Sequence, residues 1–281
     1  MGRAGRTAIV ATLLAGASLL PVTADAATIL GQSNRDGTYE VFSIDTGTGA
    51  ATSSFTQNPT AGNNDGFSPN ALGSGSVLYA VNDFDAGGHT LLVNGANTGF
   101  VLNGTVAAGM AVDKSYYYVT NTGDLYEVKD AALASRSQSK VKDLFSGSTS
   151  YSFGDIAYDG SKVYASYGNG NESGGTNFFA TFNLDGSGFS SIPATLRYAG
   201  LAFAGGSLWG TLFAAGTLHQ VNTASGASLL SKTITGLGGL GITDAATVPI
   251  PGAALLFGSA LAGLAWVRRR GRSDGAALAA G

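Results

Sequence analysis

The apolar residues of positions 27–247 fall in short runs and not along one face of a helix. These runs are rich in Val, Tyr, Phe and Thr, and no stretch keeps a 3.6-residue apolar period over three turns. Asp-Gly and Asn-Gly pairs separate many of the runs, and both residues of such a pair accept the positive φ that tight hairpins need. The pattern predicts antiparallel β-structure throughout, with hairpin turns at Asp36, Asp65, Asn94, Asn103, Asp159, Asn169 and Asp185.

An internal repeat emerges when the runs are aligned. Each unit has a small-apolar first strand, a second strand with an aromatic residue, and a third strand similar to Leu-Tyr-x-Val. The second-strand aromatics are Tyr79, Tyr118, Tyr164 and Trp209, spaced 39, 46 and 45 residues apart. First strands are expected at 71–72, 110–112, 156–158 and 201–203, and third strands at 91–93, 125–128, 178–182 and 218–221.

The two ends of this region supply a fifth unit. Residues 28–32 and 39–45 match a second and a third strand without a first, and residues 240–243 match the missing first strand. A split unit of this kind is typical of a closed β-propeller, since pairing the chain ends removes the exposed sheet edges. The predicted fold class is therefore all-β, a β-propeller of about five blades over residues 27–247. The alternative is a β-sandwich or barrel with fortuitous periodicity.

One repeat carries a specific resemblance. It reads Tyr118-Val119-Thr120-Asn121 and is followed by Leu125-Tyr126-Glu127-Val128. This unit resembles the YVTN repeats of surface-layer β-propellers, and Tyr79-Ala80-Val81-Asn82 echoes it. The resemblance implies a propeller fold.

Residues 1–26 have the layout of a secretory signal peptide. Arg3 and Arg6 precede an apolar run over 8–20, and the small residues Ala24 and Ala26 form a cleavage site. We expect signal peptidase to cut between Ala26 and Ala27.

A second signal is expected at the C-terminal end. Residues 248–252 read Val248-Pro249-Ile250-Pro251-Gly252, an uncharged apolar helix is expected over 253–267, and Arg268, Arg269, Arg270 and Arg272 follow. Because arginines in short flanks stay on the cytoplasmic side, the region between the two signals is predicted to be translocated, and 273–281 is a cytoplasmic tail.

This tail resembles the PEP-CTERM sorting signals, in the VPLPA-CTERM variant, over residues 248–272. It differs from that variant at Ile250 and Gly252, where Leu and Ala are usual. The resemblance implies a membrane-embedded, exosortase-type protease as partner, which removes the helix and passes the exported domain to the cell surface or extracellular matrix of a Gram-negative-type bacterium.

Composition narrows the alternatives. The chain has no cysteine, which excludes a lipoprotein anchor, disulfides and thiolate metal sites. Positions 27–247 hold nine Lys and Arg against sixteen Asp and Glu, a net charge of −7 (9 − 16), so we expect no nucleic-acid partner. No cofactor is indicated.

Candidate ligating residues are few. His89 and His219 fall in non-adjacent repeats, so we expect solvated strand positions and no shared metal site. Asp83 and Asp85, on a glycine-containing loop, are the calcium candidates, but the later bidentate acid of such sites is missing and a solvated loop is the alternative.

Candidate catalytic residues are also few. The acids near expected first strands are Asp113, Asp155, Asp159 and Asp244. Asp113 and Asp159 fit turns, which leaves Asp155 nearly alone, whereas a glycosidase needs two carboxyl groups flanking one bond. The repeated aromatics could stack on sugars, but their common position in each repeat favours packing between blades.

Two motif matches lack the context that they need. Residues 236–241 fit the dinucleotide fingerprint, but no helix is expected after them. Residues 271–275 fit the serine-hydrolase elbow, but they lie beyond the expected membrane helix.

The sequence therefore predicts an exported surface or matrix protein, inserted transiently in the inner membrane, that acts as a non-enzymatic binding or structural module. Extracellular polysaccharide or another surface protein is the expected partner. The alternative is a secreted carbohydrate- or lactone-processing enzyme that uses Asp155 and loop acids.

Overall fold

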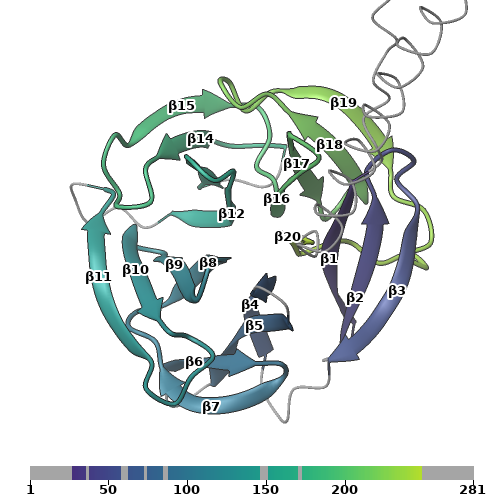
Figure 1. The fold of residues 1–281 in the computed structure, drawn as a ribbon. Helices are drawn as coiled ribbons and strands as arrows, with labels where there is room; N and C mark the ends of the chain where they lie inside the picture. Colours follow the sequence, from purple (N-terminus) through teal and green to yellow (C-terminus); the bar gives the residue numbers. More distant parts are fainter. Residues whose placement is uncertain are drawn as a thin grey trace, which may run out of the picture.

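A computed structural model describes residues 27–35, 38–57, 63–72, 75–84, 88–145, 151–169 and 173–248. These residues form five antiparallel sheets of four strands each, arranged as blades around a central axis (Figure 1). The predicted five-bladed β-propeller is confirmed, and the sandwich alternative is wrong.

The three inner strands of each blade follow the predicted repeat, and a fourth, outermost strand, which the repeat did not include, completes the blade. We number the blades I to V along the chain, and each is given below from its innermost to its outermost strand. Blade I contains β20 (Asp244–Thr247), β1 (Thr28–Arg35), β2 (Thr38–Asp45) and β3 (Ala51–Gln57). Blade II contains β4 (Asn63–Leu72), β5 (Gly75–Phe84), β6 (Gly88–Val93) and β7 (Ala96–Val101). Blade III contains β8 (Val106–Val112), β9 (Ser115–Thr120), β10 (Asp124–Lys129) and β11 (Ser137–Asp143). Blade IV contains β12 (Ser152–Tyr158), β13 (Val163–Gly168), β14 (Asn177–Phe182) and β15 (Ser190–Ala194). Blade V contains β16 (Gly200–Ala204), β17 (Ser207–Leu212), β18 (Thr217–Val221) and β19 (Ser228–Thr233).

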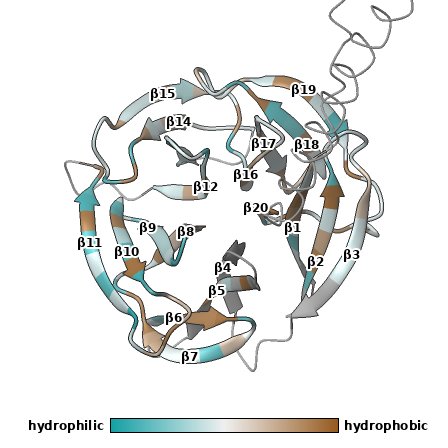
Figure 2. Cartoon of the chain, in the orientation of Figure 1, coloured by the Kyte–Doolittle hydropathy of each residue, from teal (hydrophilic) through white to brown (hydrophobic). Residues whose placement is uncertain are grey.

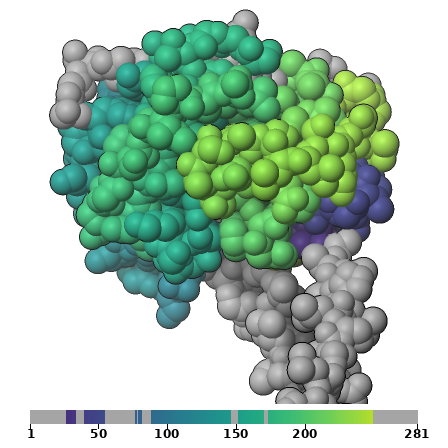
Figure 3. Space-filling view, turned by 90° about the horizontal axis from the view of Figure 1, so that it is seen from above, coloured from purple at the N-terminus to yellow at the C-terminus, as the bar shows by residue number. Residues whose placement is uncertain are grey.

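The last described strand closes the ring. β20 pairs antiparallel with β1, from Ile29 opposite Thr247 to Gln32 opposite Asp244. In Figure 3 the yellow-green end of the described chain lies beside the purple first strands. Closure by the chain ends is therefore confirmed.

The position of the closing strand was predicted four residues too early. Residues 240–243 are not a strand; they form the approach to β20. Ile242 is buried there and occupies the space over Gly31, where a Cβ would meet its methyl group at 3.1 Å. Thr243 N–H donates to the Gln32 carbonyl oxygen at 2.7 Å. The apolar side chain of Ile242 thus packs beneath the blade, and the small residues that follow it form the innermost strand.

Aromatic side chains fill the spaces between blades. Tyr79 and Tyr118 are fully buried with Tyr116 between blades II and III, and the Tyr79 and Tyr116 rings lie 5.6 Å apart. Tyr164 packs in a cluster with Leu201 and Leu208 of blade V, and Trp209 is buried between blades V and I. The repeated aromatics therefore pack between blades, as the sequence favoured, and they do not line a sugar-binding face.

Burial falls from the inner strands to the outer ones. In Figure 2 β6 is largely brown, whereas β11 carries teal segments. Four consecutive residues of β6 are buried and none of β11 is. This gradient is what a blade needs when only its outermost strand contacts solvent.

Most of the predicted turns are present. Asn94 joins β6 to β7 with a φ of 51°, Asp113 joins β8 to β9 with a φ of 53°, and Asp159 and Asp185 lie in the tight connections of blade IV. Two predictions were wrong. Asp65 lies inside β4, at a register irregularity between Asn63 and Gly66. Asn103 lies in the connection from blade II to blade III and not in a hairpin. In both places the Asp-Gly or Asn-Gly pair lies in irregular backbone and not in a hairpin turn.

The predicted terminal signals lie outside the described residues, except for Ala27 at one end and Val248 at the other. So do Asp36, the 271–275 match and Asp85, and the side chain of Asp83 is not described. Within the described part of the chain, no helix is long and apolar enough to cross a membrane.

Candidate functional site

A pair of buried carboxyl groups lies where the innermost strands meet. Asp155 of β12 is 1% exposed, and its side chain hydrogen-bonds to that of Asp244 on β20. The backbone N–H of Ile156 donates to one Asp155 oxygen at 2.7 Å, and that of Leu201 donates to the other at 2.6 Å. The N–H of Ala245 is a further donor to the same carboxyl group. Asp155 therefore connects β12, β16 and β20, which belong to three different blades.

The strand register explains how this pair forms. Asp155 lies opposite Ser166, Gly200 opposite Thr211, and Asp244 opposite Gln32, so the three occupy the same place in blades IV, V and I. A Cβ on Gly200 would lie 2.5 Å from the Ala245 nitrogen. Because the middle blade has no side chain here, Asp155 reaches across it to Asp244.

Burial raises the pKa of Asp155 to about 8, and the hydrogen bonds from Asp244, Leu201, Ile156 and Ala245 oppose that rise. A hydrogen bond between two carboxyl groups also requires that one of them is protonated. The pair therefore keeps a proton at neutral pH.

A tyrosine hydroxyl group lies within electrostatic range of the pair. Tyr116 of β9 is fully buried, and its ring extends over Gly109 of β8. Burial raises the pKa of Tyr116 well above its usual value, and Asp244 and Asp155 raise it further. The hydroxyl oxygen has no hydrogen-bond partner among the described residues. Tyr116 is therefore neutral at neutral pH, beside a carboxyl pair that shares a proton.

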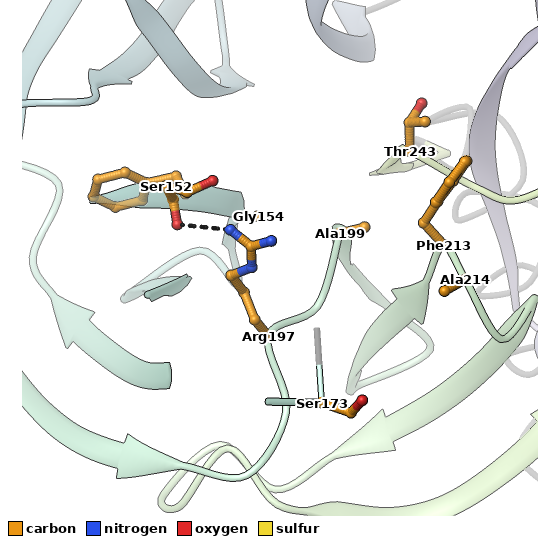
Figure 4. Close-up of a pocket in the computed structure, with 9 residues that line it drawn as sticks. Ser152, Gly154, Ser173, Arg197, Ala199, Phe213, Ala214 and Thr243 are labelled. Atoms are coloured by element: carbon orange, nitrogen blue, oxygen red, sulfur yellow. Dashed lines mark hydrogen bonds between the residues drawn. The ribbon is translucent and has the colours of Figure 1, made fainter. Parts of the chain in front are cut away.

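A pocket of about 560 Å³ adjoins the carboxyl pair. It lies at the end of the ring where blades IV, V and I begin, since Gly154 and Thr243 precede Asp155 and Asp244 in the chain. Its lining residues come from the starts of inner strands and from the loops beside them: Ser152, Phe153, Gly154, Ser173, Arg197, Ala199, Phe213, Ala214 and Thr243. Figure 4 shows the Arg197 guanidinium beside Ser152 and Gly154, with Phe213 and Thr243 on the opposite side of Ala199.

The Arg197 guanidinium and the Phe213 ring of this pocket are both accessible to a ligand. Arg197 Nη1 donates to the Ser152 carbonyl oxygen at 3.4 Å, which is longer than an ordinary N–H···O bond. Phe213 is 47% exposed, which is unusual for a large apolar side chain. The pocket thus presents a guanidinium, an aromatic ring and several hydroxyl groups to solvent.

A second hollow of about 300 Å³ shares Phe213 with the pocket and is bordered by residues 236–241. This is the segment that fits the dinucleotide fingerprint. It forms a loop, with positive φ at Gly236, Gly238 and Gly239, and leads into β20 instead of a helix. The loop therefore lacks the helix N-terminus with which that motif holds a pyrophosphate.

The prediction that both histidines are solvated was wrong. His89 and His219 are 5% and 7% exposed, on β6 of blade II and β18 of blade V. The His219 ring shares hydrogen bonds with the hydroxyl groups of Thr217 at 2.8 Å and Ser228 at 2.9 Å, and burial lowers its pKa. The blades are not adjacent, as predicted. No group of three or more His, Cys, Asp or Glu residues within the described ranges could hold a metal ion.

The prediction that Asp155 stands nearly alone was also wrong. Asp113 and Asp159 are turn residues as predicted, but Asp244 joins Asp155. The sequence holds a signal for this pairing: in both Asp155-Ile156-Ala157-Tyr158 and Asp244-Ala245-Ala246-Thr247, an Asp comes before the last three residues of an innermost strand. This signal was missed because the closing strand was placed at 240–243, so that Asp244 fell after the strand and not within it.

The comparisons with known proteins concern the fold. No family model matches the chain, and no curated protein matches it. Among solved structures, one chain of a nidogen/laminin complex shares 11% identity at a TM-score of 0.47, covering 79% of this chain and 97% of that one. A protein of unknown function from Bacteroides caccae shares 10% identity at a TM-score of 0.46, covering 78% and 77%. The computationally designed Ika8 protein shares 12% identity at a TM-score of 0.38, covering 78% and 65%.

Proposed function

We propose that the chain is an exported protein of the cell surface or extracellular matrix, and that its propeller is a binding module without enzymatic activity. The two sequence signals support export, processing by signal peptidase and sorting by an exosortase-type protease. Mass spectrometry of the mature protein tests this part. A C-terminus near Pro251 is expected, whereas an intact Arg268 cluster would mean a permanently anchored protein.

The pocket beside the carboxyl pair is the observation that carries the binding function. Its volume of about 560 Å³ lies within the range of small-ligand sites. Sugars offer a hydroxyl-rich edge and an apolar ring face, and the pocket offers hydroxyl groups, a guanidinium and the exposed ring of Phe213. An extracellular polysaccharide is therefore the partner that we propose.

A glycan-binding assay with the full-length chain tests this function. We expect Phe213→Ala to weaken polysaccharide binding by about tenfold, because losing an aromatic contact costs about 1–1.5 kcal/mol. Leu133→Ala is the control, since Leu133 is 53% exposed but does not line the pocket. A wild-type chain that binds no glycan would contradict the proposal.

The carboxyl pair favours a second candidate function, hydrolysis of a carbohydrate or lactone. A buried carboxyl group with a raised pKa is what a general acid requires, and the pair adjoins the pocket. Against this, both Asp155 oxygens accept backbone N–H groups and the side chain is 1% exposed, so substrate access is poor. Hydrolysis of a glycan panel by the wild type, lost in a folded Asp155→Asn variant, would establish the enzymatic function instead.

A further inference from the structure

We propose that the pocket takes a carboxylate-bearing sugar unit, a hexuronate of an acidic polysaccharide, with the Arg197 guanidinium on its carboxylate. This inference rests on the proposed polysaccharide-binding function and names the class of sugar.

Arg197 supplies the charge complementarity. It is the one charged residue among the nine that line the pocket, and it forms no ion pair within the described part of the chain. Its single hydrogen bond to Ser152, at 3.4 Å, leaves most of its five N–H donors without a protein acceptor among the described residues. A guanidinium binds a carboxylate through two parallel hydrogen bonds, which makes a carboxylate the best-matched ligand group.

The carboxyl pair repels an anion in the pocket less strongly than two ionised carboxylates would. Asp155 and Asp244 directly follow the lining residues Gly154 and Thr243, so full ionisation would place two negative charges beside the ligand. Burial keeps a proton on the pair at neutral pH, which halves that charge. The pocket is therefore more favourable to an anion than the net charge of the exported region suggests.

The remaining lining groups suit the rest of a sugar ring. Phe213 and Thr243 lie across the pocket from Arg197, with Ala199 between them (Figure 4). An exposed aromatic ring packs on the apolar face of a pyranose, and the hydroxyl groups of Ser152 and Ser173 can exchange hydrogen bonds with sugar hydroxyls. The Thr243 hydroxyl donates to the Gln32 carbonyl oxygen at 3.1 Å, so it can accept a hydrogen bond from the sugar. Charge recognition and ring recognition are thus placed on opposite walls.

Two oligosaccharides provide the test: trigalacturonate and its methyl ester, in which each carboxylate is replaced by an uncharged methyl ester. With the full-length chain, isothermal titration calorimetry is expected to show at least tenfold tighter binding of the acid. Arg197→Gln is expected to weaken acid binding by about 10- to 100-fold, since a charge-assisted hydrogen bond contributes about 1.5–3 kcal/mol, and to leave ester binding unchanged. Arg197→Lys keeps the charge but loses the planar fork, so it should fall between the two.

Controls separate a local effect from misfolding. Lys129→Gln removes a surface charge from β10, whose lysine side chain is 64% exposed, and should change neither affinity. The thermal midpoint of each variant checks that it is folded. Equal binding of acid and ester, or an acid affinity that Arg197→Gln does not change, overturns the carboxylate assignment while the polysaccharide-binding function stands. If neither oligosaccharide nor any other glycan binds, both proposals fail.

Discussion

Gly200 is the residue on which the arrangement at the axis depends. The equivalent positions in blades IV and I carry Asp155 and Asp244, and a side chain on Gly200 between them would meet the backbone of Asp244 and Ala245. The backbone of β20 also approaches Gly200 closely, so the glycine serves the packing of two blades as well as the pair.

Replacing Gly200 tests this role. Gly200→Ala is expected to lower the free energy of unfolding by about 1–3 kcal/mol, because its Cβ would lie 2.5 Å from the Ala245 nitrogen and a strand backbone cannot easily move. Gly174→Ala is the matched control, since a Cβ there meets nothing within 4 Å, and it should be neutral or slightly stabilising. Urea unfolding of the two variants measures the difference, and equal stability would contradict the close approach.

The pairing of Asp155 with Asp244 and the burial of the two histidines could not be predicted from the sequence. Repeat alignment located the strand that holds Asp155, but a partner in another blade depends on which residues face the axis. The burial of the two histidines likewise depends on contacts between residues that are distant in the sequence. Their burial follows from contacts such as the 5.8 Å approach of the His219 ring to Tyr198, which no local pattern predicts.

At the scale of elements, Asp155 joins β12, β16 and β20 through backbone N–H donors, and its hydrogen bond to Asp244 is the one that needs a proton on the carboxyl pair. Among the described residues, the titratable groups that interact with Asp155 are Asp244 on β20 and Tyr116 on β9. Loss of the shared proton would bury two negative charges side by side, which opposes full ionisation of the pair, whereas Tyr116 stays neutral.

Stability should therefore fall as pH rises. An unfolded Asp has a pKa of about 3.9, and burial raises that of native Asp155 to about 8. The native state thus holds more protons between these values, and the free energy of unfolding decreases with pH across this window by at most about 1.4 kcal/mol per pH unit. Below the unfolded pKa the full contribution is present; above the native pKa it is lost.

Asp155→Asn isolates this contribution, because an amide cannot ionise. Urea unfolding between pH 5 and pH 9 should show a flatter pH dependence for this variant than for the wild type. Asp185→Asn is the control: Asp185 is a turn residue whose pKa is lowered by hydrogen bonds from Ser187, so it does not titrate in this range. Parallel pH profiles for the wild type and Asp155→Asn would rule out the protonated pair.

At the scale of the whole molecule, the sequence predicted that the chain ends close the ring, but it did not predict which residues form the closing strand. The split fifth repeat shows that chain ends must pair, because a propeller with an open blade exposes sheet edges. Which four residues form the closing strand depends on Ile242 packing over Gly31, a contact between residues 211 positions apart (242 − 31). The repeat therefore predicts the architecture, and tertiary packing sets the last strand.

Closure can be tested by tying β1 to β20. Leu30 and Ala246 are opposite each other in the antiparallel pair, and such residues have Cα atoms about 4.5–5.5 Å apart, within the range that a disulfide spans. The chain has no cysteine, so Leu30→Cys with Ala246→Cys can form only one bond within the molecule. This bond would close a loop of 216 residues (246 − 30), which is expected to stabilise the oxidised protein by about 3–5 kcal/mol relative to the reduced form.

The comparison of oxidised with reduced protein cancels the packing cost of the two substitutions, because both forms carry them. Each single-cysteine variant should show no change in thermal midpoint on oxidation. If β20 did not lie on β1, the cysteines would not join without denaturation, and the oxidised form would be no more stable than the reduced one. A rise in the thermal midpoint on oxidation would instead establish that β1 and β20 form one sheet in solution.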